Sequence, residues 1–193
     1  MVDVAELPEG SWITVDTAPI IYLMEDHPTL LEPYLPVFER IEAGTLHGVV
    51  STVTLAEFLA GPLRNNDEIL ADRYYQTLAN SNNWHIQELD APLSFTAARI
   101  RTRYELKLPD AIQVATAIHS NSSALITHDR DFNSVTEIPI LSSATLSWPN
   151  FRGHLVRWDD NPLLRGEQPW HANAGAFQAN TRNASPAWWS MTV

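Results

Sequence analysis

Residues 12–23, WITVDTAPIIYL, decide how the chain is expected to fold. Residues 12–15 form a short apolar run with the length and composition of a buried strand, and Asp16 follows it directly. Residues 18–26 then place apolar side chains at the three- and four-residue spacing of a helix. Because the interior of an apolar segment cannot solvate a charge, we expect Asp16 to lie at the rim of a sheet.

The combination of an apolar segment and an acid occurs three more times. Glu57 lies in VVSTVTLAEFLAGP (49–62), Asp110 in KLPDAIQVATAIH (107–119) and Asp129 in ALITHDRDF (124–132). Each acid alone has a structural explanation, since Asp16 suits a helix cap, Glu57 is a good helix former, and Asp110 suits the second position of a helix after Pro109. Together the four acids predict carboxylates gathered at one rim, where they would need a divalent cation.

Strand-like and helix-like segments alternate along the chain. Strands are expected at residues 12–16, 47–52, 84–89, 124–128 and 138–141, and helices at residues 18–26, 29–45, 54–61, 68–81, 92–106 and 109–121. Pro33 and Pro36 are expected to break or shorten the second helix. This order predicts an α/β fold, a three-layer α/β/α sandwich with a parallel sheet. Ligands of such sheets bind beyond the carboxyl ends of the strands, where Asp16 and Asp129 would lie.

Length and composition favour one compact domain with an extension. The chain has 193 residues, of which 45% are hydrophobic. We expect a domain over residues 1–149 and an irregular extension over residues 150–193, which is rich in Asn, Ala, Gly and Pro. The absence of cysteine excludes disulfides, thiolate metal sites and thiol nucleophiles. The motifs GxxxxGK(S/T) and GxGxxG are both missing, so binding of a nucleotide cofactor lacks support.

The N-terminal segment does not resemble a targeting sequence. Residues 1–10, MVDVAELPEG, contain neither a basic region nor the apolar region of a signal peptide. No later segment has the length and hydrophobicity of a membrane span. We therefore expect a cytoplasmic protein that does not enter a membrane.

Charge is distributed unevenly. The chain carries a net charge of −11, while residues 150–193 hold four arginines and three acids, so the preceding residues carry all of the negative excess. An acidic surface repels phosphate unless a cation or a local basic stripe intervenes. The candidates for such a stripe, which is equally explained as a solvated helix face, are Arg99, Arg101, Arg103 and Lys107. The acidity would also suit a basic protein partner.

The extension is rich in aromatic residues, namely Trp158, Trp170, Phe177, Trp188 and Trp189. Exposed indoles usually find a surface to cover. Three alternatives are open: packing on the chain's own domain, insertion into a partner or dimer groove, and stacking on nucleic-acid bases. A homodimer is one expected form of the protein.

The acids suit the hydrolysis of a phosphodiester. That reaction requires an activated water and a stabilised leaving oxygen, and a hard cation held by carboxylates supplies both. We assign Asp16, Asp110 and Asp129 to metal contact, direct or through water, and Glu57 either to activation of the water or to metal binding. Arg130 and Asp131 are alternatives as supporting residues, although Asp131 also suits a cap of the following turn. His128 is set aside as a ligand, because neighbours on a strand point to opposite faces.

The segments VDTAPIIYL, TLAEFLAGP, KLPDAIQVATAI and ALITHDRDF resemble the PIN-domain family, in particular the VapC-type toxin ribonucleases of bacterial toxin–antitoxin pairs. The resemblance covers residues 12–142 in the same order. It implies an α/β/α sandwich and an endoribonuclease that depends on Mg²⁺ or Mn²⁺. The acidic set of the family falls on Asp16, Glu57, Asp110 and Asp129, with Thr127 as the small hydroxyl residue near the last acid.

The resemblance also implies RNA as the substrate and a small antitoxin as a partner. We expect the antitoxin to place an Arg- or Lys-bearing segment against the four acids. The sequence leaves two other classes of protein as alternatives. A phosphotransfer module of the receiver or haloacid-dehalogenase type needs a lysine at a later strand end, whereas the only lysine is Lys107. A catalytically silent binding protein that acts through its Trp-rich extension is the remaining alternative.

Overall fold

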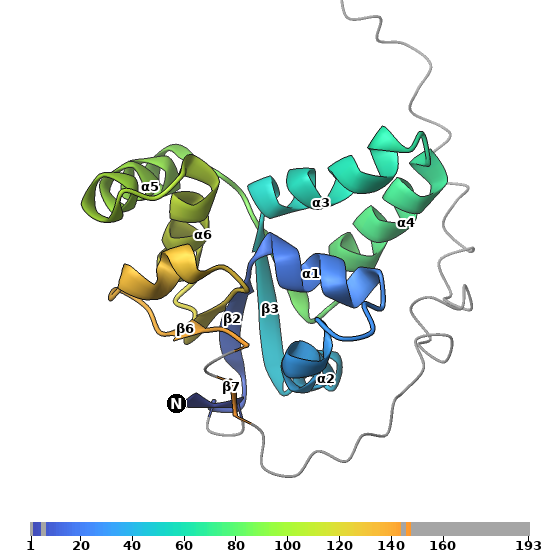
Figure 1. Cartoon of the computed structure of the whole chain (residues 1–193), viewed down its shortest axis with the longest axis horizontal. Helices are drawn as coiled ribbons and strands as arrows, with labels where there is room; N and C mark the ends of the chain where they lie inside the picture. Colours follow the sequence, from blue (N-terminus) through green and yellow to red (C-terminus); the bar gives the residue numbers. More distant parts are fainter. Residues whose placement is uncertain (1, 5–6, 144–145, 148–193) are drawn as a thin grey trace, which may run out of the picture. The chain divides into compact units, whose positions relative to one another are not determined.

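The computed structural model describes residues 2–4, 7–143 and 146–147. Its main sheet has five parallel strands in the order β4-β3-β2-β5-β6 (Figure 1). They are β2 (Ser11–Val15), β3 (Leu46–Ser51), β4 (Trp84–Gln87), β5 (Ala124–Ile126) and β6 (Ile140–Leu141). A separate two-stranded parallel sheet pairs β1 (Val2–Asp3) with β7 (Leu146–Ser147). The predicted parallel sheet is confirmed.

Helices connect the strands and cover both faces of the main sheet. They are α1 (Thr17–Met24), α2 (Leu35–Glu42), α3 (Thr52–Arg64), α4 (Glu68–Ala79), α5 (Ala91–Tyr104) and α6 (Leu108–His119), with the 3-10 helices η2 (Glu32–Tyr34) and η3 (Arg130–Ser134). The chain steps from β2 to β3 to β4 in one direction and then returns to β5 on the other side of β2. Right-handed crossovers therefore put α1–α4 on one face and α5 and α6 on the other, as Figure 1 shows.

The centre of the sheet is buried on both faces. Ile13, Thr14 and Val15 of β2 are all inaccessible to solvent, as a strand between two parallel neighbours should be. On α6 every residue from Ala111 to Ala117 is buried, and this helix packs on β2, β3 and β5. The alanines of α6 let its backbone approach the sheet closely, which fixes the position of the first turn of α6 at the carboxyl rim.

Proline accounts for the main difference from the expected helices. The helix expected over residues 29–45 begins only at Leu35, and Glu32–Tyr34 form a 3-10 turn before it. Pro36 lies near the start of α2, where its missing N–H costs nothing. By contrast, α3 continues beyond its expected end at residue 61 and includes Pro62 in its last turn.

Three short elements were not predicted: η3, β1 and β7. The predicted boundary at residues 149/150 and the aromatic residues of the extension lie outside the described residues, so these expectations stay predictions. Within the described ranges, no helix is both long and apolar enough to cross a lipid bilayer.

Gly48 lets two strands pack closely. It faces Trp84 of the neighbouring strand β4, and a Cβ at this position would overlap the indole ring. We predict that Gly48→Ala lowers the free energy of unfolding by about 2 kcal/mol, because the ring must shift within a packed environment. Thermal unfolding followed by circular dichroism measures the change.

Gly61→Ala is the matched control. Gly61 lies in α3, and a Cβ there meets nothing within 4 Å. This substitution should leave the melting temperature unchanged or raise it, since alanine favours a helix by about 1 kcal/mol over glycine. Equal melting temperatures for Gly48→Ala and the wild-type protein would contradict the packing role of Gly48.

Candidate functional site

The site lies where the chain reverses its direction across the sheet. β2 and β5 are neighbours, yet the crossover that leaves β2 covers one face and the crossover that enters β5 covers the other. Such a reversal opens a crevice at the carboxyl ends of the strands. Asp16 follows β2, and Thr127 and Asp129 follow β5. The backbone N–H of Asp16 donates to the carbonyl of Ile126 at 2.9 Å, which fixes the two strand ends together.

Both oxygens of Asp16 accept a hydrogen bond. Oδ1 accepts from the backbone N–H of Thr17 at 2.7 Å and so caps α1. Oδ2 accepts from the hydroxyl of the buried Thr127, also at 2.7 Å. The same hydroxyl oxygen accepts from the backbone N–H of Asp129 at 3.0 Å. Thr127 thus fixes the relative positions of Asp16 and Asp129 through its hydroxyl group.

Asp129 begins the turn after β5. Its Oδ1 accepts from the backbone N–H of Asp131 at 2.9 Å, so Asp129 is the cap of η3. The alternative that Asp131 caps this turn is therefore wrong, because the capping residue is Asp129 and Asp131 lies within η3. Asp131 is exposed and lies 3.5 Å from the ammonium group of Lys107, while Arg130 is exposed at the start of η3.

Asp110 is a half-buried acid with an unpartnered oxygen. It is the third residue of α6, one position later than expected, because the helix begins at Leu108. Its Oδ2 is buried, and no hydrogen-bond partner for it lies among the described residues. Burial raises the pKa of Asp110, the charge of Lys107 lowers it, and Asp129, Asp131 and Glu57 raise it further. A buried carboxylate oxygen in this state favours a proton or a cation.

Glu57 reaches the same rim from α3. Its side chain is exposed, and Oε2 accepts a hydrogen bond of 2.6 Å from the hydroxyl of Thr17. Sequence reasoning did not identify Thr17, although its place directly after Asp16 could have indicated it. A second bond joins α3 to α6, since the buried amide of Gln113 donates to Thr54 Oγ1 at 2.6 Å. These contacts hold Glu57 near the start of α1 and hold α3 against α6.

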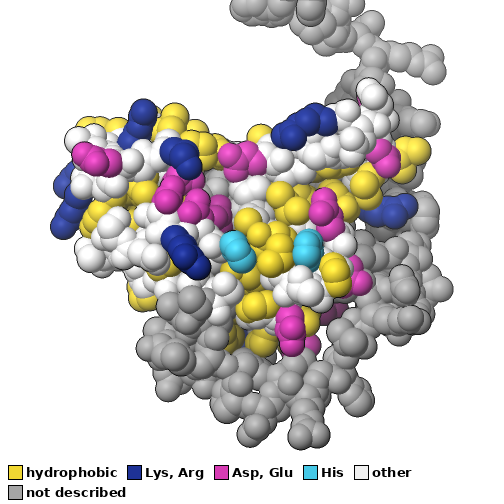
Figure 2. Space-filling model, viewed as in Figure 1, with side chains coloured by type: hydrophobic (Ala, Val, Ile, Leu, Met, Phe, Trp, Pro, Cys, Tyr) yellow, Lys and Arg dark blue, Asp and Glu magenta, His cyan; other side chains and the backbone are white. Residues whose placement is uncertain are grey.

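The charges of the four acids act on one another. Burial raises the pKa of Asp16 to about 6, its hydrogen bonds with Thr127 and Thr17 oppose this change, and the charges of Asp110 and Glu57 add to it. Because Asp129 and Glu57 also act on Asp110, the structure brings the four predicted acids into one electrostatic cluster. Figure 2 shows acidic side chains gathered where α6 and α3 approach each other.

The cluster suits a hard cation by its chemistry. All of its donors are oxygens, and one of them, Asp110 Oδ2, is buried without a partner among the described residues. In that part of the chain, however, no three Asp, Glu or His side chains converge closely enough to hold an ion directly. Mg²⁺ keeps several of its waters and requires few protein ligands. The arrangement is therefore compatible with a hydrated divalent cation that contacts its carboxylates partly through water.

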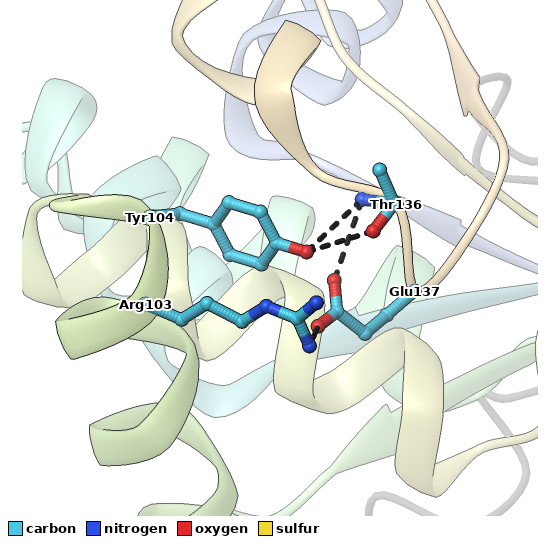
Figure 3. A network of polar contacts seen from close by, with 4 residues as sticks. All are labelled: Arg103, Tyr104, Thr136 and Glu137. Carbon is cyan, nitrogen blue, oxygen red and sulfur yellow. Dashed lines mark hydrogen bonds and ion pairs between the residues drawn. The ribbon is translucent and has the colours of Figure 1, made fainter.

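Two of the four cations in the basic stripe proposed from the sequence are paired with acids. Arg103 forms an ion pair of 2.8 Å with Glu137, and the hydroxyl of Tyr104 lies 2.9 Å from that of Thr136 (Figure 3). Lys107 faces Asp131. Because two of its four cations are engaged in this way, the stripe offers less charge to a phosphate backbone than its sequence suggests.

The comparisons with known proteins identify the family and the fold. The model of the PIN domain family matches residues 13–138, which is more than half of the chain. The chain belongs to the PIN domain family. A comparison with curated protein sequences finds no match.

Solved structures share the fold of this PIN domain at low sequence identity. VapBC2 from Rickettsia felis, bound to a DNA fragment from its promoter, is 17% identical, with 68% of this chain and 98% of that chain covered and a TM-score of 0.55. A toxin–antitoxin complex from Klebsiella pneumoniae is 23% identical over 68% and 97%, with a TM-score of 0.53. VapC20 from Mycobacterium tuberculosis, a toxin that cleaves the sarcin–ricin loop, is 17% identical over 63% and 93%, with a TM-score of 0.51.

The raised pKa values predict how the stability of the PIN domain depends on pH. The folded state holds a proton on Asp16 up to a pH of about 6, whereas the unfolded state releases it near its ordinary pKa of about 4. The free energy of unfolding in EDTA should therefore fall as pH rises from about 4 to about 6. Chemical denaturation at a series of pH values measures this slope.

Neutralising Asp110 should relieve the electrostatic repulsion between this residue and the neighbouring acids. We predict that Asp110→Asn raises the free energy of unfolding at pH 7 by about 1 kcal/mol, because one charge leaves the cluster. Added Mn²⁺ should then raise the melting temperature of the wild-type protein but have little effect on that of the variant. Asp72→Asn, at an exposed position of α4, is the control. An identical Mn²⁺ response in all three proteins would exclude metal binding at the cluster.

Proposed function

We propose that this chain is an endoribonuclease that depends on Mg²⁺ or Mn²⁺ and acts as the toxin of a toxin–antitoxin pair. The observation that supports this most directly is the electrostatic cluster that Asp16, Glu57, Asp110 and Asp129 form at the carboxyl rim of a PIN domain. Clustered carboxylates repel one another, and this repulsion lowers the stability of the folded state. Binding of a cation during catalysis would be a physical reason for the carboxylates to lie together despite this cost.

The acids have separable roles in this proposal. Asp16, Asp110 and Asp129 would hold the cation directly or through water, and Thr127 orients the first and last of them. When bound, the cation would acidify a water and stabilise the charge on the leaving oxygen. Glu57, held by the hydroxyl of Thr17, would accept the proton of the attacking water or add a further ligand.

Arg130 and Asp131 have weaker support as functional residues. Both are exposed, and Asp131 lies 3.5 Å from the ammonium group of Lys107. A guanidinium at residue 130 could contact a phosphate near the site. Asp131 acts on the site only through its charge, which raises the pKa of Asp110.

A basic antitoxin is the partner that fits the acidic rim. The similar structures from Rickettsia felis and Klebsiella pneumoniae are complexes of toxins with antitoxins. On this chain, with its net charge of −11, an arginine could bridge two carboxylates and displace the cation. The homodimer expected from the sequence stays a prediction.

Cleavage of RNA tests the proposed activity. The purified protein should cut single-stranded RNA in Mg²⁺ or Mn²⁺, and EDTA should stop the reaction. Asp110→Asn should lower the rate at least about 100-fold, because it removes a charge needed in the transition state. Asp131→Asn should be much milder, and Asp72→Asn should match the wild-type rate in a gel assay.

Two results would contradict parts of this proposal. Wild-type cleavage rates in Asp110→Asn would remove Asp110 from the site. A folded protein that binds Mn²⁺ without cutting any RNA would favour the catalytically silent binding protein instead.

Competition with the cation tests the proposed mode of inhibition. A fluorescent peptide of about six arginines should bind the protein in EDTA through the clustered carboxylates, and Mn²⁺ should displace it. Binding should weaken roughly tenfold when Asp16→Asn and Asp110→Asn are combined, whereas the control pair Asp67→Asn and Asp72→Asn removes the same charge from α4 and its cap. Equal affinity for both double variants would show that only net charge attracts the peptide.

A further inference from the structure

Four aromatic side chains lie together beside Asp16. The ring of Tyr22 lies 5.5 Å from that of His128, 5.6 Å from that of His27 and 6.3 Å from that of Tyr34, measured between ring centroids. Tyr34 and His128 are 6.4 Å apart. We refer to Tyr22, His27, Tyr34 and His128 as the aromatic cluster. None of them has a role in the chemistry assigned to the acids.

One side of the aromatic cluster is buried and hydrogen-bonded, and the other side is accessible to solvent. Tyr34 is completely buried, and its hydroxyl donates to the carbonyl of Thr127 at 3.1 Å and lies 3.2 Å from Nδ1 of His128. The ring of His27 accepts from the backbone N–H of Leu30 at 3.2 Å. By contrast, Tyr22 is half-buried and His128 is exposed. The cluster therefore offers ring surface to solvent in a fixed position.

Thr127 connects the aromatic cluster with the acids. Its carbonyl accepts from Tyr34, while its hydroxyl donates to Asp16 Oδ2. Tyr22 also lies close enough for the charge of Asp16 to add to the effect of burial, and both raise the pKa of this tyrosine. A hydrophobic surface between two histidines appears beside the acidic side chains in Figure 2. The exposed part of the aromatic cluster therefore lies within reach of the charge of Asp16.

We propose that Tyr22 and His128 form a stacking subsite for one unpaired nucleobase of the RNA, next to the phosphodiester that the acids act on. The inference rests on the ribonuclease function proposed above. A nucleobase has the flat π-face that stacks on tyrosine and histidine rings. Stacking does not depend on charge, which matters for a chain with a net charge of −11 and a basic stripe that is partly paired with acids.

The subsite has a consequence for the kind of RNA that binds. A base within a duplex is already stacked on its neighbours and cannot present its face to Tyr22. The protein should therefore select single strands, loops or bulges. Stacking accepts all four bases, so this subsite positions the strand without reading its sequence.

Binding to a labelled RNA tests the subsite separately from cleavage. In the Asp110→Asn background, fluorescence anisotropy is measured with a single-stranded RNA of about 12 nucleotides and with the same strand in a duplex. Tyr22→Leu should weaken single-strand binding roughly tenfold, and Tyr22→Phe should retain it because the flat ring remains. Tyr75→Leu, at an exposed tyrosine of α4, should have no effect. In the cleavage-competent protein, Tyr22→Leu should raise KM and leave kcat nearly unchanged.

His128→Ala provides a second variant at an exposed position, should Tyr22→Leu lower the melting temperature strongly. Unchanged single-strand affinity in both folded variants would overturn the subsite and leave the cluster as packing or as a protein contact. Equal affinity for the duplex and the single strand would overturn it as well. Absence of cleavage by the wild-type protein would instead count against the ribonuclease function, while the binding comparison would still decide the subsite.

Discussion

The hydrogen bond from Thr127 to Asp16 is the contact on which the site depends. It joins the ends of β2 and β5, the two strands at which the topology reverses. Through the same hydroxyl, Thr127 also receives the backbone N–H of Asp129, and through its carbonyl it receives the hydroxyl of Tyr34. One buried residue, Thr127, thereby positions Asp16, Asp129 and the buried Tyr34 of the aromatic cluster. A shift of this residue would disturb the proposed metal, nucleophile and nucleobase positions together.

Electrostatic repulsion is the second constraint on the rim. Asp16 and Asp110 are both partly buried, and the charges of neighbouring acids add to the raised pKa of each. A sequence selected only for stability would have a neutral residue in place of Asp16 or Asp110, since a neutral side chain removes the repulsion between the carboxylates. Lys107 lowers the pKa of Asp110, yet the other acids act against it. A cation would relieve this repulsion, whether it is the proposed metal ion or a basic segment of the proposed antitoxin.

Particular segments show how far sequence reasoning reaches. The strand that precedes Asp16 was predicted because residues 12–15 form a contiguous run of strand-like composition. Helix α6 was predicted because its apolar residues follow helical spacing after Pro109. The shortening of the second expected helix was predicted from Pro33 and Pro36. The 3-10 helix η3 was not predicted, because a single turn has no periodic pattern in the sequence. Thr17 was missed as the residue that holds Glu57, since this bond joins side chains 40 residues apart.

The sequence by itself determined the alternating strands and helices, the parallel sheet and the order of the four acids, because apolar periodicity and local capping chemistry act over a few residues. Only the tertiary structure decided which side chains meet. It placed Asp110, whose Oδ2 has no hydrogen-bond partner among the described residues, within reach of the charges of Glu57 and Asp129, and it placed Tyr22 against His128. It also paired two cations of the basic stripe with acids. These relations depend on crossovers that bring distant segments to one rim, and no local pattern encodes the resulting distances.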